Sequence, residues 1–249
     1  VKVDLLKALG MSDSQAIKTA IDCAAATKAF VEFGEGTYTL SEQIRMDARH
    51  TGIRGIKGAS MGRTNIVFNW EQPEKWDSES NKTDARAWCG LIVEDLPDIL
   101  LEDFTIEYKG TFYWKGETYR GSVMNIMMVD TTNGLVRRVE SKGSNRIGIF
   151  FTSHNGEVTA LGKQFKEGKI TLEQLRESVI KASGNRAIEC VAHHNRVAGI
   201  AYAWQKDFQA LNNYCHHNGH EANGGTGYGI TALSGSLNFG LGSLIKGNK

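Results

Sequence analysis

One short phrase recurs along the second half of the chain. It reads CVAHHNRVAGIAYAW and then YCHHNGHEANGGTGYGITALS, with a fainter copy upstream in VESKGSNRIGIFF. Ile149, Ile200 and Ile230 each follow a glycine in these copies and are 51 and 30 residues apart. Without an evident insertion at residues 156–183 and a glycine-rich excursion at 220–226, both intervals become 23 residues. Parallel strands that repeat at this short period leave no room for a crossover helix in each turn, so the repeat predicts an all-β fold, a parallel β-helix.

Composition supports this architecture and excludes other classes. The chain has 28 glycines and only 2 prolines, which suits many tight turns between strands whose N–H groups must all pair with the next rung. The 29 basic residues balance the 28 acidic ones, so no net field favours nucleic acid. No apolar run is long enough to span a bilayer. Four scattered cysteines form neither a disulfide framework nor a CxxC metal motif, and we expect buried thiols.

The N-terminal segment predicts a helix that precedes the coil. Apolar residues recur at helical spacing in SDSQAIKTAIDCAAATKAF, and Ser12 with Gln15 forms a capping-box pattern. We expect a helix over about Ser12–Ala29. The segment FVEFGEGTYTLSEQIRM then alternates as strands do, with a turn at Gly34–Gly36.

This opening resembles that of the pectin-lyase-like superfamily. The helix followed by V-x-F-x-x-G-x-Y-x-L, and the later segments IRGIKGASMGRTNIVFNW and LIVEDLPDILLEDFTIEYKG, carry the resemblance. It implies a right-handed parallel β-helix whose end is closed by a helix. We therefore expect one domain over residues 1–249. Because SLNFGLGSLIKGNK begins a further rung, we expect the coil to continue beyond residue 249 or to be covered in a homo-oligomer.

The insertion at 156–183 predicts a second helix. Thr171 and Gln174 form a capping-box pattern, an apolar stripe follows, and Gly184 is a C-terminal stop. Two roles stay open for it. It could be an arm that packs on the coil and covers a sheet face, or it could form the wall of a groove.

The repeat also aligns polar residues. It places His193 over His216, His194 over His217 and Asn195 over Asn218, with Asn145 one rung earlier. Stacked asparagines in tight turns are structural, because their amides hydrogen-bond along the coil. The four imidazoles lack a carboxylate or third-ligand pattern, so we expect no metal there; a His acting as an acid or base is the stronger alternative.

Aromatic and cationic side chains are interspersed in a second segment, YKGTFYWKGETYRG. Flat rings suit sugar faces, and Lys or Arg suits carboxylates, so this segment could bind an acidic polysaccharide. The alternative is a surface loop whose rings pack on the coil. The candidate substrate-binding residues are Tyr113, Trp114, Tyr119, Arg120 and, in a later rung, Trp204. No paired-aspartate signature of the polygalacturonase type is present.

Within the superfamily the chain is most similar to mannuronan C5-epimerases and alginate-type polysaccharide lyases. IGIFFTSHNGE, CVAHHNRVAGIAY and NNYCHHNG…GYGI follow the order of their motif rungs. The resemblance implies that His154 stands near the motif histidine, Tyr228 where a later rung has a catalytic histidine, and Lys115 at a catalytic lysine. Ile147 replaces the motif tyrosine, and the Asp-Pro pair is missing.

The expected activity is removal of the C5 proton of a uronate. Because this proton is weakly acidic, a cation must neutralise the adjacent carboxylate; Lys115, Arg120 and Arg146 are candidates. The candidate proton carriers are His154, His194, His217 and Tyr228, with Tyr228 and His154 ranked first. Departure of the 4-linked oxygen defines a lyase, and reprotonation from the other face defines an epimerase.

We thus expect an extracellular, secreted or periplasmic enzyme whose partner is an acidic polysaccharide. No cofactor is expected, with calcium as the open alternative, and no nucleic acid or membrane span. The alternatives are a tailspike or adhesin-type polysaccharide-binding rod on a virion surface, and a non-catalytic carbohydrate-binding solenoid.

Overall fold

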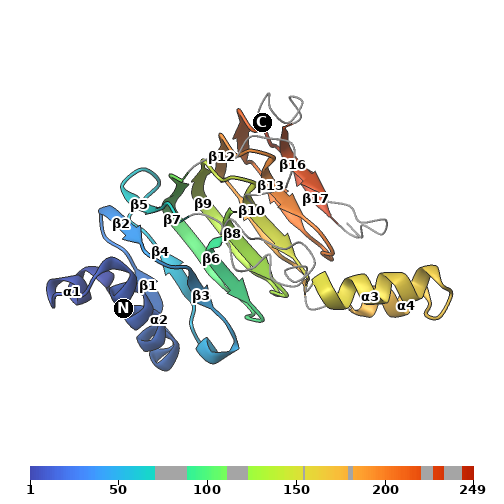
Figure 1. Ribbon diagram of the computed structural model, residues 1–249, viewed down its shortest axis with the longest axis horizontal. Helices are drawn as coiled ribbons and strands as arrows, with labels where there is room; N and C mark the ends of the chain where they lie inside the picture. Colours follow the sequence, from blue (N-terminus) through green and yellow to red (C-terminus); the bar gives the residue numbers. More distant parts are fainter. Residues whose placement is uncertain (71–88, 111–122, 154, 179–181, 220–226, 233–242) are drawn as a thin grey trace.

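The computed structural model describes residues 1–70, 89–110, 123–153, 155–178, 182–219, 227–232 and 243–249. Its strands stack in parallel into two long sheets that share one core (Figure 1). The fold is a right-handed parallel β-helix, as the 23-residue repeat and the resemblance predict. The sequence-aligned Ile149, Ile200 and Ile230 are register partners on neighbouring rungs, and Ile126 lies one rung before them.

Within the described ranges, one sheet has six strands and the other eleven. The six-stranded sheet contains β3 (Ile44–Met46), β6 (Cys89–Glu94), β8 (Met124–Val129), β10 (Ile147–Thr152), β13 (Ala198–Tyr202) and β16 (Tyr228–Ala232). The eleven-stranded sheet contains β1 (Phe30–Glu32), β2 (Gly36–Leu40), β4 (Gly55–Lys57), β5 (Thr64–Phe68), β7 (Leu100–Tyr108), β9 (Leu135–Lys142), β11 (Arg186–Ile188), β12 (Val191–His193), β14 (Gln209–Leu211), β15 (Tyr214–His216) and β17 (Leu244–Lys246).

Left-handed residues form columns at the corners of the rungs, and two of these columns lie along the eleven-stranded sheet. One column bends the eleven-stranded sheet into two flat halves; its members are Asp103, Arg138, Glu189, Asn212 and Gly247. The other column precedes that sheet and consists of Asp98, Asn133, Gly184 and Asp207. Asn, Asp and Gly are the residues that adopt positive φ most readily, so most of these positions carry the chemistry that a left-handed corner requires.

Helices close the N-terminal end of the coil. The predicted helix is α2 (Asp13–Thr27), and the capping box of Ser12 and Gln15 is present. A shorter helix, α1 (Val3–Ala8), precedes it and was not expected from the sequence. Both lie at the N-terminal end of the coil in Figure 1. Cys23 is exposed on α2, so the expectation that all thiols are buried is wrong there; the buried face of α2 is formed by Ile17, Ala20, Ile21 and Ala24.

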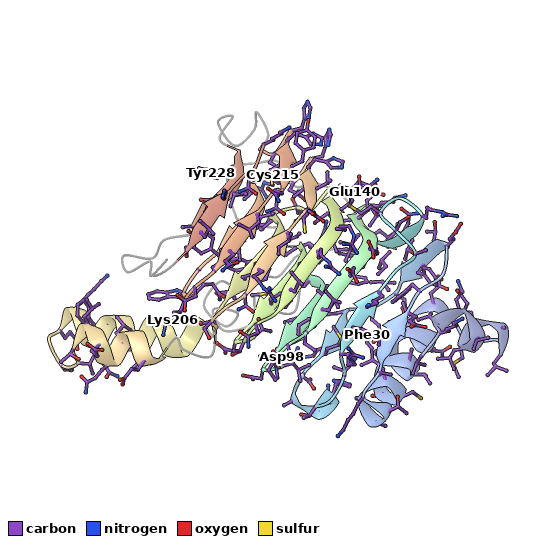
Figure 2. The ribbon with its side chains drawn as sticks, turned by 180° about the vertical axis from the view of Figure 1, so that it is seen from behind. Phe30, Asp98, Glu140, Lys206, Cys215 and Tyr228 are labelled. Atoms are coloured by element: carbon purple, nitrogen blue, oxygen red, sulfur yellow. The ribbon has the colours of Figure 1, made fainter. Side chains whose placement is uncertain are left out.

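The insertion forms a helical hairpin rather than one helix. It consists of α3 (Asn155–Lys166) and α4 (Leu172–Ser178). Thr171 and Gln174 exchange the two predicted capping hydrogen bonds, and Gly184 has positive φ. The hairpin projects away from the strands in both views (Figures 1 and 2), so its described helices do not cover a sheet face as an arm packed on the coil would.

Candidate functional site

The structure places five of the eleven predicted site residues. Arg146, His194, Trp204, His217 and Tyr228 lie in described parts of the chain. The other six lie outside the described residues: Tyr113, Trp114, Lys115, Tyr119, Arg120 and His154. The segment that carries five of them begins after Tyr108, which itself belongs to β7 and is buried against the ring of Phe68.

A polar row crosses four rungs at the carboxyl end of the eleven-stranded sheet. Parallel pairing aligns Glu107 of β7, Lys142 of β9, His193 of β12 and His216 of β15. Two residues earlier on the same strands stand Thr105, Glu140, Val191 and Tyr214. Because strand side chains alternate between faces, both rows project from the same outer face of the coil.

The predicted imidazole ladder is present. The rings of His193 and His216 stack at a centroid distance of 4.7 Å, and those of His194 and His217 at 5.2 Å. Each rung also joins its two rings, because Nδ1 of His193 lies 2.6 Å from Nδ1 of His194 and the equivalent distance in the next rung is 2.7 Å. We call these four residues the imidazole cluster.

The stacked asparagines beneath the cluster are structural, as predicted, but the register differs by one residue. Asn218 Oδ1 accepts hydrogen bonds from the backbone and side-chain N–H groups of Asn195. Asn195 Oδ1 in turn accepts from the backbone N–H of Ser144. The alignment of Asn145 with this ladder is therefore wrong, since the 51-residue step from Asn195 leads to Ser144.

Glu140 anchors the cluster and was not anticipated from the sequence. Its Oε1 lies 3.0 Å from Nε2 of His193, and its Oε2 accepts a hydrogen bond of 2.7 Å from the buried hydroxyl of Thr105. Partial burial of Glu140 favours the protonated acid, but the hydrogen bonds from His193 and Thr105 and the charge of Lys142 outweigh it, so the pKa of Glu140 lies below its usual value. Glu140 is therefore an anion at neutral pH.

The anion fixes the protons of the two rings beyond it. A carboxylate only accepts hydrogen bonds, so His193 carries its proton on Nε2. In its neutral form its Nδ1 is then an acceptor, and Nδ1–H of His194 is the donor. This leaves a lone pair on Nε2 of His194, whose ring is exposed. We call Glu140, His193 and His194 the histidine relay.

The histidine relay holds a neutral base at its outer end. Burial lowers the pKa of His194, and the nearby positive charges of His193, His217 and Lys142 lower it further. The pKa of His216 is also lowered, first by burial and then by its imidazole neighbours. Among the described residues no carboxylate is hydrogen-bonded to His216 or His217, although the charge of Glu140 also acts on His216 and opposes the lowering of its pKa.

Cations stand beside the relay. Lys142 Nζ lies 3.8 Å from Glu107 and 3.9 Å from Glu140, with a side chain that is 30% exposed. These separations are too long for tight ion pairs, so the ammonium group is available to a third anion. Arg146 is half-buried four residues further along, and its carbonyl accepts hydrogen bonds from the N–H groups of Val197 and Ala198.

The outer face of the six-stranded sheet has the opposite character. A register row of Ile92, Met127, Phe150 and Ala201 is buried in a second apolar cluster. The same cluster contains Ile147, which replaces the motif tyrosine, and half-buried Trp204 packs against it. Tyr228 shares the row of Ile147 and Ala198 at the last rung, where it is 48% exposed. Figure 2 shows Tyr228 and Glu140 on strands of different sheets, with Tyr228 nearer the C-terminal end of the coil.

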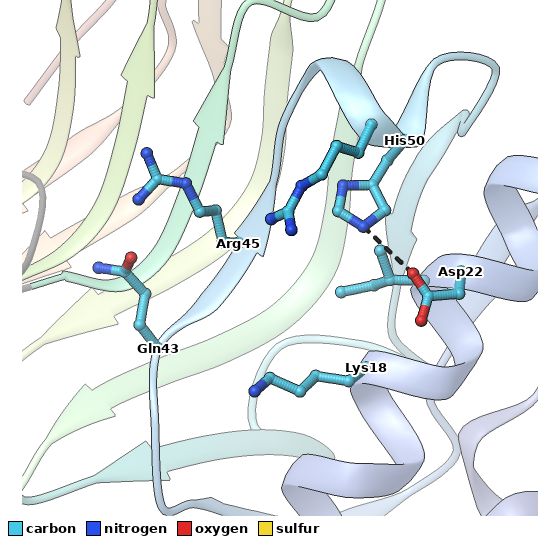
Figure 3. A pocket seen from close by; sticks show the side chains of 7 residues that line it. Lys18, Asp22, Gln43, Arg45 and His50 are labelled. Carbon is cyan, nitrogen blue, oxygen red and sulfur yellow. Dashed lines mark ion pairs between the residues drawn. The ribbon is translucent and has the colours of Figure 1, made fainter.

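Two concave surfaces lie elsewhere. The first, about 350 Å³, lies between α2 and the segment that runs from Gln43 through β3 to His50, with Lys18, Asp22 and Arg45 around it (Figure 3). Its charges are paired: Lys18 with Glu42, Arg45 with Glu94, and His50 with Asp22 at 3.3 Å. It is therefore a neutralised junction between cap and coil.

The second concavity, about 620 Å³, runs along the coil beside the left-handed column. Its lining residues are Asp98, Ile99, Leu100, Asn133, Leu135, Gly184, Arg186, Asp207 and Gln209. We call it the axial groove.

The described residues contain neither a cluster of metal ligands nor a membrane-spanning helix. In the ranges that the structure describes, no group of three or more His, Cys, Asp and Glu side chains could hold a metal ion. No described helix is both long and apolar enough to cross a membrane.

Comparisons with known proteins support the fold. No family model matches the chain, and no curated protein matches it in sequence. Bacteriophage phi29 gene product 12, in its pre-mature form, matches 88% of this chain and 26% of its own at 17% identity, with a TM-score of 0.59. The catalytic domain of a GH87 alpha-1,3-glucanase matches 93% of this chain and 32% of its own at 14% identity, with a TM-score of 0.57.

A third similar structure is the A-module of the Azotobacter vinelandii mannuronan C-5 epimerase AlgE4. It matches 84% of this chain and 54% of its own at 14% identity, with a TM-score of 0.43. The chain thus spans about a third or less of the length of the first two proteins. At these identities the likeness shows the β-helix fold alone.

Proposed function

We propose that the protein is a carbohydrate-active enzyme that removes the C5 proton of a uronate in an acidic polysaccharide, outside the cell that makes it. The histidine relay is the observation that carries this proposal. It presents a neutral imidazole nitrogen at the surface, backed through His193 by the Glu140 anion. Such an arrangement suits a general base, because the positive charge that forms on the relay is stabilised by the carboxylate.

The chemistry uses groups on both sides of the relay. A cation beside the uronate carboxylate stabilises the charge that develops when C5 loses its proton, and Lys142, whose Nζ lies 3.9 Å from Glu140, stands beside the relay. Lys115, Arg120 and Arg146 remain candidates for the same task. The aromatic segment with Tyr113, Trp114 and Tyr119 follows β7, whose Glu107 is two strands away from His193, and it could bind the adjoining sugars.

Two outcomes are open after proton abstraction. In a lyase the C5–H electrons form the C4–C5 double bond, the C4–O bond breaks, and an acid protonates the leaving oxygen. In an epimerase an acid returns a proton to the opposite face of C5. Tyr228 and His154 are the proposed second proton carriers, and His217 is a weaker candidate because no anion is hydrogen-bonded to its rung within the described residues.

The test is turnover of polyuronates by matched variants. The protein is incubated with alginate, pectate and glycosaminoglycans in D₂O, with ultraviolet absorbance reporting unsaturated uronates and mass spectrometry reporting deuterium at C5. His194→Asn keeps a residue that tolerates the left-handed backbone at this position and should lower kcat/KM about 10²- to 10⁴-fold. His217→Asn, with the same backbone and stacking but no carboxylate, should lower it about tenfold at most. Equal losses in the two variants would contradict the relay, and Tyr228→Phe tests the returning acid.

A polysaccharide-binding rod, on a virion surface for example, is the second candidate. The buried apolar row on the outer face of the six-stranded sheet favours it, because Ile92, Met127, Phe150 and Ala201 offer no charged group to a uronate. Inertness toward every polyuronate, together with a stable trimer in size-exclusion chromatography and retention on a polysaccharide column, would establish this alternative over the enzyme.

A further inference from the structure

We propose that the axial groove is a second saccharide-binding site, and that it takes an extended, neutral stretch of polysaccharide. The groove crosses four rungs, since Asp98, Asn133, Gly184 and Asp207 occupy equivalent positions on successive turns of the coil. At about 4.8 Å per strand, three steps give a length of roughly 14 Å along the coil. An extended chain that runs parallel to the coil axis fits this shape.

The groove presents polar groups that the protein leaves available. In the part of the chain that the structure describes, the side chains of Arg186, Asp207 and Gln209 make no hydrogen bond or ion pair with other residues. Asp98 has only the long hydrogen bond of 3.3 Å that Asn133 donates to it. Carboxylates accept from sugar hydroxyls, and guanidinium and amide groups donate to sugar oxygens.

One register row of the groove is apolar on its first two rungs. Leu100 and Leu135 are register partners on the outer face of β7 and β9, and both remain partly exposed. Arg186 and Gln209 continue the same row on the next two rungs. Partly exposed leucines beside these polar groups suit the C–H faces of sugar rings, as in sites that combine apolar walls with a few placed polar groups.

The charge of the groove selects against a polyuronate. Its lining contains the two carboxylates of Asp98 and Asp207 and the single guanidinium of Arg186. The carboxylates would repel a chain with one negative charge on each sugar. Their separation along three rungs also far exceeds the 5–9.5 Å of a glycosidase pair, so the groove binds rather than cleaves. The axial groove and the histidine relay therefore recognise chemically different stretches of polysaccharide.

Affinity gel electrophoresis with soluble α-glucan, β-glucan and galactomannan tests the groove. At least one of these neutral polymers should retard the wild-type protein. Asp207→Gly deletes a carboxylate without backbone strain, since Gly184 occupies the same left-handed column. Arg186→Met removes the guanidinium and keeps an apolar stem. Each variant should weaken binding about tenfold, as expected for the loss of a hydrogen bond that involves a charged group.

The matched control is Asp95→Gly, which removes an exposed aspartate with the same positive φ from outside the groove and should bind as the wild type does. Absence of retardation by all three polymers, or unchanged retardation of both groove variants, would overturn the proposal. The readout is independent of polyuronate turnover, which the groove variants should retain. Loss of C5 chemistry in His194→Asn with unchanged binding of neutral polymer would separate the two sites.

Discussion

The outer faces of the two sheets have the same backbone and opposite chemistry. On the six-stranded sheet the row of Ile92, Met127, Phe150 and Ala201 is apolar and buried. On the carboxyl half of the eleven-stranded sheet the row of Glu107, Lys142, His193 and His216 is polar and partly exposed. Strand pairing is parallel and in register in both cases. The coil therefore fixes where side chains stand, and the outward residue types alone decide which face can do chemistry.

Stacked side chains serve two different purposes on the two faces: apolar rows add stability, and imidazole rows carry chemical groups. Buried apolar rows add to the core on both sides of a parallel sheet, which is how such sheets gain stability. The stacked imidazoles place equivalent groups about one strand spacing apart, and a single carboxylate on the neighbouring rung makes one of them unlike the rest. Glu140 gives the His194 rung a property that the His217 rung lacks.

The largest expected effect concerns the apolar face. Phe150→Ala removes a ring that is 6% exposed and should lower the free energy of unfolding by about 3–5 kcal/mol. Urea denaturation followed by circular dichroism measures it. Tyr214→Ala, on the polar face and 50% exposed, is the matched aromatic control and should cost about 1 kcal/mol or less. Equal costs would mean that the outer face of the six-stranded sheet is open, and the comparison would fail.

The next effect concerns the origin of the relay's basicity. Glu140→Gln replaces the anion by an amide and should lower kcat/KM about 10²-fold on a polyuronate. The acid limb of the pH profile should also move to lower pH, because the imidazolium form loses its stabilising negative charge. Glu107→Gln removes a carboxylate that lies beside Lys142, in the same row, and should change both quantities much less. An unchanged acid limb in Glu140→Gln would show a purely structural role.

A third prediction compares the stability effects of the asparagine ladder and the imidazole cluster at the turn that contains His194 and Asn195. Asn195→Ala leaves the buried backbone N–H of Ser144 without its partner, and should cost about 1–3 kcal/mol of stability. His194→Asn, one residue earlier and exposed, should change stability by less than about 0.5 kcal/mol while it removes activity. Thermal denaturation of both variants measures the contrast, and the reverse order would refute the division into a structural and a chemical ladder.

The period of the repeat made much of the fold predictable. When the insertions are removed, the repeat is 23 residues long and aligns Ile149, Ile200 and Ile230 correctly, because insertions in the loops between strands leave the strand register unchanged. The capping boxes at Ser12 and Thr171 were also predictable, since they depend on local sequence. Helices α1 and α3 were missed: α1 is short, and the helical spacing of Val158, Leu161 and Phe165 in α3 was overlooked.

The site was harder to predict because its contacts cross rungs. Glu140 is 53 residues before His193, and the signal was available: the 51-residue step from His193 reaches Lys142, and Glu140 lies two residues earlier on the same face. The same step shows why Asn145 was misaligned. The continuous apolar run of Ile147–Phe151 also indicates burial on both faces, a signal that the resemblance to epimerase motifs obscured.

The smallest expected effect is the pH dependence of the imidazole cluster. The pKa values of His194 and His216 lie below 6.5 in the folded protein, because burial and positive neighbours oppose protonation. The unfolded chain then binds more protons than the folded one as pH falls below 6.5, so the contribution of these groups to stability is fully present above 6.5 and decreases below it. Glu140 adds a loss at lower pH, since its depressed pKa stabilises the fold only while the carboxylate is ionised. On lowering the pH, the wild type should therefore lose more free energy of unfolding than a His194→Asn, His216→Asn double variant, in which Glu107 and Lys142 remain. Phe150→Ala should instead lower the free energy of unfolding equally at all pH values. Chemical denaturation between pH 7.5 and pH 5 would measure the slopes, and identical slopes for the wild type and the double variant would show that the cluster does not couple proton binding to folding.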